Sequence, residues 1–153
     1  MKLALIIFVL VNVFGQIYLF IQAKISQSRT SPGLKDGLLS KCRLFSISGI
    51  CSEFPKDKIH FFPPINIVSN ENIIDHSISI IQEMGGTILD QNENYIAATF
   101  TTKFYKFVDD FELRVDTDTN TLHIRAAARV GEFDFFTNKK RAQEFSLRFS
   151  GAK

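Results

Sequence analysis

The sequence predicts an α+β fold, in which an antiparallel sheet of three to four strands packs against two helices and an N-terminal hydrophobic helix precedes the domain. Three observations predict it: a long apolar run at the amino terminus, apolar residues at helical spacing in two later segments, and alternation of apolar and polar residues between those segments. A chain of 153 residues allows one such domain plus a short appendage. With 45% hydrophobic and 22% charged residues, the composition excludes a disordered chain and a polytopic membrane protein.

The amino-terminal segment, residues 1–23, is predicted to be a membrane anchor or a signal segment. The apolar run from Leu3 to Ile21 is long enough to span a bilayer, which takes about 17 to 25 residues. A signal peptide with cleavage after Gly15 or Ala23 is the alternative, but neither site has the usual Ala-x-Ala pattern, so we favour an uncleaved anchor. A buried helix of the domain is a third interpretation, which would need a larger protein around it.

Two features of the sequence bear on the side of the membrane on which the domain lies, and they point in opposite directions. The basic residues after the run outnumber Lys2 before it, which favours a cytoplasmic domain. The even pair Cys42 and Cys51 suits a disulfide in an oxidising compartment, worth about 2 to 3 kcal/mol. Two unlinked thiols, or a zinc site with His60, are the alternatives, and structural zinc requires four ligands. We expect the disulfide, and hence a domain on the extracytoplasmic (periplasmic) side, or a secreted or periplasmic protein if the segment is cleaved.

The chain between the apolar run and the domain is predicted to be a polar linker over residues 24–37, because Ser, Thr, Pro and Gly dominate it. A single domain then covers residues 38–153. Pro63 and Pro64 favour an edge or an extended connection. A helix follows, with Asn70 as its N-cap and Gly85-Gly86 as its stop.

Alternation predicts the strands that follow. Three segments have a period of two, and turn residues at 117–120 join the second and third into a hairpin; the segments are Tyr95–Phe104, Asp110–Asp116 and Thr121–Val130. The last helix is expected from about Thr137 to Phe149, with Ala142, Phe145 and Phe149 on its buried stripe. Both helices are expected on one face of the sheet.

The predicted hairpin joins an acidic strand to a basic one. A four-residue turn sets Glu112 opposite Arg125, and a two-residue turn sets Asp110 opposite Arg129. Either register predicts cross-strand ion pairs that contribute about 0.2 to 1 kcal/mol each. Both registers keep the apolar residues of the two strands on the same face of the sheet.

The first turn of the last helix is also basic. Cations there are disfavoured by about 0.3 to 1 kcal/mol, because the amino end of a helix is positive, and a bound phosphate or carboxylate would resolve the conflict. The sequence therefore predicts an anion site at Arg125, Arg129, Asn138 and Arg141, with supporting acidic residues Asp109, Asp110, Glu112 and Asp134.

Catalytic motifs are absent from the sequence. It contains no nucleophile elbow, no phosphate-binding glycine-rich loop and no His-Glu-x-x-His zinc motif. The adjacent carboxylates Asp109 and Asp110 point to opposite faces of a strand and cannot share a proton. We expect no metal and no cofactor. A net charge of +2 is too small for a nucleic-acid binder that neutralises phosphates.

Several motifs resemble the bacterial and plastid family catalogued as domain of unknown function 1499, over most of residues 37–145. They are Gly37-Leu-Leu-Ser-Lys-Cys42, Cys51-Ser52, Phe107-Val-Asp-Asp110 and the spaced set Arg125, Arg129, Gly131, Asp134, Asn138 and Arg141. The resemblance implies an N-terminal membrane or export segment and no established activity.

This chain departs from the family pattern at Ala126 and Ala128, where serines are usual, at Phe136 for a glycine and at Lys139 for an arginine. Its cysteine loop is also longer and lacks the usual Pro-Asn. If those serines and that glycine shape a site, the site of this chain is altered.

Three functions follow as hypotheses. The first is a membrane-tethered extracytoplasmic module of the cell envelope that binds an anionic lipid head group, phosphate or carboxylate ligand. The second is an envelope structural or assembly factor that uses the loop Phe133–Phe136 against a protein or the bilayer. The third is a hydrolase-type enzyme with Asp110 or Asp134 as acid or base, which lacks an evident nucleophile. An enzyme is the less favoured class, and the protein partner is not identified by the sequence.

Overall fold

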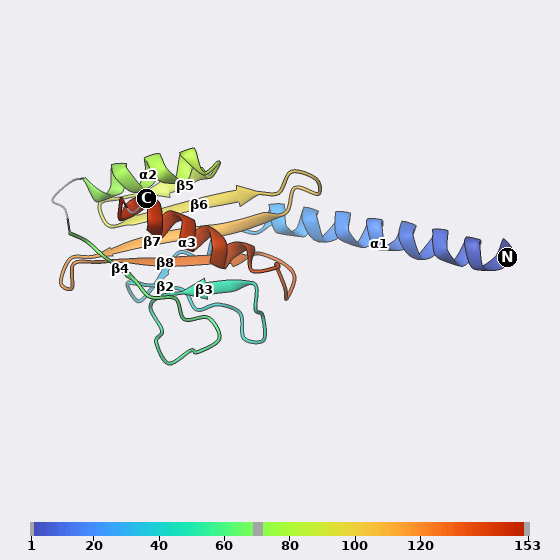
Figure 1. Cartoon of the computed structure of the whole chain (residues 1–153), viewed down its shortest axis with the longest axis horizontal. Coiled ribbons are helices and arrows are strands. Elements are labelled where there is room, and N and C mark those ends of the chain that lie inside the picture. The colour runs from blue at the N-terminus through green and yellow to red at the C-terminus, as the bar shows by residue number, and fades with distance from the viewer. Residues whose placement is uncertain (1, 69–71, 152–153) are drawn as a thin grey trace.

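The computed structural model describes residues 2–68 and 72–151, and an α+β domain follows one long helix (Figure 1). The helices are α1 (Lys2–Ser28), α2 (Ile73–Glu83) and α3 (Thr137–Phe149). The strands are β1 (Leu34–Lys35), β2 (Leu38–Leu39), β3 (Gly49–Cys51), β4 (Ile65–Asn66), β5 (Thr87–Gln91), β6 (Tyr95–Thr101), β7 (Val108–Asp116) and β8 (Thr121–Ala128).

The main sheet is antiparallel and has the strand order β3-β8-β7-β6-β5, with β4 also paired to β8. The predicted hairpin is its centre: β7 and β8 are joined by the four-residue turn, which sets Glu112 opposite Arg125. The predicted α+β class is confirmed, and the sheet has six strands instead of three or four. The strands that alternation missed, β3, β4 and β5, have two to five residues, which is too short for a period of two to stand out.

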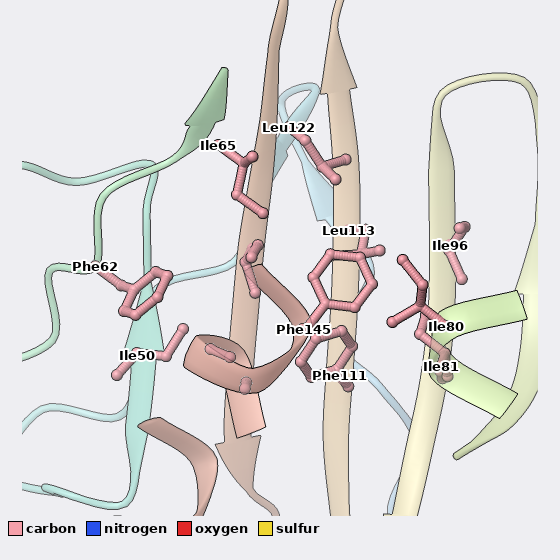
Figure 2. Packing of buried hydrophobic residues seen from close by; sticks show 14 of the residues in the cluster. Ile50, Phe62, Ile65, Ile80, Ile81, Ile96, Phe111, Leu113, Leu122 and Phe145 are labelled. Carbon is pink, nitrogen blue, oxygen red and sulfur yellow. The ribbon is translucent and has the colours of Figure 1, made fainter. Parts of the chain in front are cut away.

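The apolar core lies between the sheet and the helices α2 and α3, which cover the same face (Figures 1 and 2). Every second residue of β7 and β8 points into this core, as the period of a strand requires. Phe111 of the sheet and Phe145 of α3 are both fully buried, and their ring centroids lie 5.4 Å apart. The predicted placement of both helices on one face is therefore confirmed.

Several predicted boundaries differ from the structure. The strand predicted from Asp110 begins at Val108, and the strand predicted to end at Val130 ends at Ala128. The sixth strand ends at Thr101 instead of Phe104, because residues 102–107 form a loop in which the Phe104 side chain is 95% exposed. Asn70, the predicted N-cap of the first domain helix, lies outside the described residues. The carboxamide of Asn72 caps α2 by accepting a hydrogen bond from the backbone N–H of Asp75 at 3.3 Å.

The amino-terminal helix α1 contains 27 residues and is the one helix in the described part of the chain that is long and apolar enough to cross a membrane. It continues past the predicted anchor boundary at residue 23 to Ser28. The segment 24–37, predicted to be a linker, lies against the face of the sheet opposite α2 and α3. Ser31 donates to the Asp110 carboxylate at 2.7 Å, and the Gly33 N–H donates to Glu112 at 3.0 Å.

The packing of α3 predicts a large difference between two substitutions on that helix. Phe145→Ala removes a fully buried ring and should lower the free energy of unfolding by about 3 to 5 kcal/mol. Leu147→Ala, whose side chain is 58% exposed, should change it by less than about 0.5 kcal/mol. Denaturant unfolding of the full chain in detergent measures both values, and equal losses would contradict this account of the core.

Candidate functional site

The face of the sheet opposite the two helices is polar and covered by the chain that follows α1. Because side chains alternate along a strand, the charged residues of β7 and β8 point to this face, with the exception of Asp109. Glu112 and Arg125 lie at its centre and are 0% and 6% exposed. Ionised groups this deeply buried require partners, so their contacts define the site.

The Glu112 carboxylate is held by three donors. Arg125 Nη1 donates to it at 2.6 Å, the Tyr95 hydroxyl at 2.6 Å, and the backbone N–H of Gly33 at 3.0 Å. Burial, together with the adjacent Glu112 carboxylate, raises the pKa of Tyr95 well above its usual value, so the phenol stays protonated and continues to donate. The predicted cross-strand pair of Glu112 and Arg125 is thus confirmed as a buried ion pair.

A second ion pair fixes the end of α1 to the sheet. Arg129 Nε donates to the Asp110 carboxylate at 2.7 Å, and Ser31 donates to the same oxygen. Arg129 Nη1 also donates to the backbone carbonyls of Ser26, at 3.3 Å, and of Arg29. The Arg29 guanidinium returns a hydrogen bond to the Arg129 carbonyl. These reciprocal contacts join residues 100 positions apart in the chain.

A pocket of about 220 Å³ lies between this segment and the sheet. Four arginines and one carboxylate line it, together with Cys42 and small residues of β3 and β8; the charged residues are Arg29, Arg43, Arg125, Arg129 and Asp110. A glycine at position 49 makes room here, because a Cβ atom on it would lie 3.1 Å from the Cys42 sulfur and 3.0 Å from Ala127 Cβ. The pocket is therefore positively charged and open to small ligands.

The donors of this pocket exceed the acceptors that the described residues supply. Arg43 is loosely paired with Glu132 at 3.7 Å, while no carboxylate of the described chain lies within 4.0 Å of the Arg29 guanidinium. The buried Arg125 Nε has no hydrogen-bond partner among the described residues. An anionic group would supply the missing acceptors.

The two cysteines are free thiols in the structure, so the predicted disulfide is not supported. Burial raises the pKa of Cys42 to about 12 and that of Cys51 to about 11. Because the thiolate is the reactive form, a thiol with such a pKa is a poor nucleophile at neutral pH. The even cysteine pair indicated a disulfide, but the burial of these thiols beside the strands gives them a packing role instead.

A separate polar cluster lies on the helix face of the sheet. Arg141 Nη1 donates to Asp109 at 3.3 Å and to Asn138 Oδ1 at 2.6 Å, and its guanidinium lies 4.3 Å from the Phe100 ring centroid. Burial raises the pKa of Asp109 above its usual value, and the charge of Arg141 opposes that rise. Arg141 is thus held by the domain itself on the face that carries the apolar core.

The amino end of α3 already has an anionic partner. The Asp134 carboxylate accepts from the backbone N–H of Phe136 at 3.0 Å and of Asn138 at 2.8 Å. It also accepts from the Asn138 side-chain amide at 2.9 Å. The conflict expected from the basic first turn of this helix is therefore resolved by a carboxylate of the same chain.

The structure divides the four predicted anion-site residues into two pairs. Arg125 and Arg129 lie on the polar face, while Asn138 and Arg141 lie on the helix face, so the four do not form one cluster. The supporting carboxylates divide in the same way, Asp110 and Glu112 with the first pair, Asp109 and Asp134 with the second. The two acid/base candidates, Asp110 and Asp134, are likewise on different faces.

Several residues of the pocket were not predicted from the sequence. Arg29 stands in a segment with the composition of a linker, and Arg43 stands in the cysteine loop. Ser31, which donates to Asp110 beside the pocket, stands in the same linker-like segment as Arg29. One signal in the sequence could have indicated them. The outward face of the central hairpin is rich in charged residues, and charges that become buried need polar groups from another segment packed against them.

A further polar cluster lies at the far end of the same face. Arg114 forms a bidentate pair with Glu53 at 2.6 and 3.1 Å and contacts Asp116, and burial lowers the pKa of the adjacent His123. Within the described ranges, no group of three or more His, Cys, Asp or Glu side chains is arranged to hold a metal ion. The charges of this cluster are matched by its own members.

The chain matches the family described as Protein of unknown function (DUF1499) over residues 25–149, and it belongs to that family. The match begins before the strands and includes the segment that covers the polar face. A search of curated proteins found no match.

The buried pair predicts a strong effect of one charge removal. Glu112→Gln leaves the Arg125 charge buried without a counter-ion and should lower the free energy of unfolding by about 3 to 5 kcal/mol. Glu144→Gln is the matched control, because it breaks an exposed Glu–Arg pair of similar length, 2.7 Å, worth less than about 1 kcal/mol. Chemical denaturation measures the two losses, and a loss below 1 kcal/mol for Glu112→Gln would show that Arg125 finds another partner.

The thiols predict a second measurable result. At pH 8, a pKa of about 12 in place of 9.0 reduces the thiolate fraction of Cys42 about a thousandfold. Unreduced protein should therefore show two titratable thiols in denaturant and slow alkylation by iodoacetamide when native. The Val68→Cys variant, at a 96% exposed position, should react at an ordinary rate in the same sample. Failure to detect thiols in denaturant would restore the disulfide.

Proposed function

We propose that this chain is a membrane-tethered domain that binds an anionic group, a phosphate or a carboxylate, in the pocket between the end of α1 and the polar face of the sheet. The excess of guanidinium groups over carboxylates in the pocket lining is the observation that carries the proposal. Arginine suits both ligand groups, since its planar fork donates two parallel hydrogen bonds to their oxygens.

The residues proposed to hold the anion are Arg125 and Arg129 from the sequence prediction, joined by Arg29 and Arg43. Arg125 and Arg129 are fixed by their ion pairs and supply a preorganised floor. Arg29 and Arg43 lie nearer the surface, where they donate to the backbone carbonyls of Arg129 and Gly131. Arg43 is also loosely paired with Glu132, whereas no carboxylate of the described residues lies within 4.0 Å of the Arg29 guanidinium. A volume of about 220 Å³ accommodates a phosphate with several waters, each of which occupies about 30 Å³.

The tether is α1, whose length and composition suit a membrane span. We propose the extracytoplasmic side for the domain, supported by the N-terminal membrane or export segments that the resemblance to the family implies. The free thiols make no contribution to this placement, and the positive-inside rule opposes it. A protease added to spheroplasts should therefore digest the domain. The α1 segment should stay in the membrane fraction after carbonate washing.

Binding is favoured over catalysis by the state of the reactive groups near the pocket. The Asp110 carboxylate is engaged by Arg129 and Ser31, and the Cys42 thiol is protonated at neutral pH. Neither group is therefore poised to act as a base or a nucleophile. The arginines bind negative charge without requiring a further reaction step.

The anion pocket predicts stabilisation by phosphate. Wild-type chain in detergent should gain about 2.7 kcal/mol at a hundredfold excess of phosphate over its dissociation constant. Arg29→Gln or Arg43→Gln should weaken phosphate binding about tenfold or more, because a hydrogen bond to a charged group contributes about 1.5 to 3 kcal/mol. Thermal unfolding across a phosphate series at fixed ionic strength measures the binding curves.

The control is Arg148→Gln, which removes the same charge from α3 at a residue paired with Glu144 and distant from the pocket lining. It should leave the phosphate curve unchanged. Parallel series with inorganic phosphate, citrate and a short-chain phosphatidic acid distinguish a free anion from a lipid head group. Identical curves for wild type, the pocket variants and the control would refute the pocket as a binding site.

A further inference from the structure

Two loops lie at the end of the domain from which α1 departs (Figure 1). Both carry exposed aromatic rings. The first is 102–107, between β6 and β7, and the second is 129–136, between β8 and α3. We call them the two aromatic loops. The β7–β8 turn lies at the opposite end of the domain, because successive turns of an antiparallel sheet alternate between its ends.

The first aromatic loop contacts α1, and the second lies close to it. The Tyr105 hydroxyl donates a hydrogen bond to the Gln16 side chain, and Gln27 Nε2 donates to the Lys106 carbonyl at 3.0 Å. The second loop lies beside the helix across a mostly apolar cavity of about 380 Å³, lined among others by Tyr18, Leu19, Phe133 and Phe135. The first loop therefore flanks α1 between residues 16 and 27, and the second flanks it at the level of residues 18 to 22.

The phenylalanine side chains of these loops are exposed, and two of them stand at residues with an unfavourable backbone conformation. Phe104 is 95% exposed and Phe135 is 75% exposed, and Phe133 and Phe136 are about half exposed. Phe135 and Phe136 both have positive φ angles, 55° and 60°, which are unusual for a residue with a bulky side chain. Four large rings gathered at one end of a domain mark an interaction surface.

The depth of these loops follows from the dimensions of the helix. The apolar run Leu3–Ile21 is about 28 Å long at 1.5 Å per residue, close to the hydrocarbon thickness of about 30 Å. Gln16 lies five residues before the end of the run, about 8 Å inside it. With α1 across a bilayer, the two aromatic loops therefore reach the boundary between head groups and acyl chains, where amphipathic elements bury about 5 to 10 Å.

Charge around the loops matches an anionic lipid surface. The first loop contains Lys103 and Lys106 and no acidic residue. The second contains Glu132 and Asp134, of which Glu132 pairs with Arg43 and Asp134 caps α3, and Lys139 and Lys140 follow it. The chain from residue 1 to Lys35 also contains no acidic residue. Lysines beside a membrane attract anionic head groups by about 1 kcal/mol each near the surface.

We propose that the two aromatic loops insert into the bilayer that α1 crosses, so that the domain docks on an anionic membrane surface in one orientation. This inference rests on the tether of the proposed function but not on the anion pocket. The inserted rings are those of Phe104, Phe133, Phe135 and Phe136. The docked orientation holds the pocket beside Arg29, about 12 Å beyond Ile21 along the helix axis and within reach of lipid head groups.

The absence of tryptophan from the sequence gives a direct test. Single-tryptophan variants Phe104→Trp and Phe135→Trp of the full chain are reconstituted into vesicles of phosphatidylcholine and phosphatidylglycerol with bromine atoms high on the acyl chains. Both variants should show blue-shifted emission and bromine quenching. The quenching should exceed that given by lipids brominated near the bilayer centre.

Two control variants give the expected extremes of bromine quenching. Val68→Trp lies at the opposite end of the domain, since the adjacent Ile67 bonds to Asn120 of the β7–β8 turn, and its emission should be unquenched. Phe14→Trp, within α1, should be quenched most strongly by the deep bromines. Quenched Phe14→Trp with unquenched loop variants would overturn the docking and leave the tether intact. Unquenched Phe14→Trp would overturn the tether itself.

A protein partner gives a different signature. If a second copy of the chain covers the loops, Phe104→Trp and Phe135→Trp will have blue-shifted emission that depends on protein concentration and is insensitive to brominated lipid. That result would also overturn bilayer docking. Circular dichroism spectra matching the wild type establish that each variant is folded before the comparison.

Discussion

The burial of one ion pair, Glu112 with Arg125, is the constraint on which the polar half of this structure depends. Two charges cannot be left in the middle of a sheet without donors and acceptors around them, since each would cost several kcal/mol. The chain after α1 supplies part of that cover through the Gly33 N–H, and Tyr95 supplies a hydroxyl. The segment that looks like a flexible linker is therefore held as part of the domain.

This constraint gives the sheet two unlike faces. One face packs against α2 and α3 around Phe111 and Phe145, and the other is built from ion pairs and covered by residues 29–40. Arg129 connects the polar face to the last turn of α1. The end of α1, the arginine pocket and the two aromatic loops consequently form one continuous region.

Most of the fold could be predicted from local pattern. The hairpin, the limits of α3 and the common side of the two helices follow from periodicity and turn chemistry, which depend on neighbouring residues. The sequence left two turn lengths open, and the structure has the four-residue turn. The strands β3, β4 and β5 could not, because they are short and are defined by their partners. Phe104 continued the alternation of β6 but lies in a loop, where the contact of the adjacent Tyr105 with α1 replaces strand pairing.

The sequence by itself determined the apolar helix, the family resemblance and the face on which each charged residue of β7 and β8 lies, since these depend on length, motif order and a period of two. Only the tertiary structure decided which charges meet. Arg29 and Arg129 are 100 positions apart, and no local pattern pairs them. Arg125 and Arg141 lie near each other in the chain but on opposite faces, because the turn into α3 carries the chain across the sheet. Long-range packing therefore selected the members of the site.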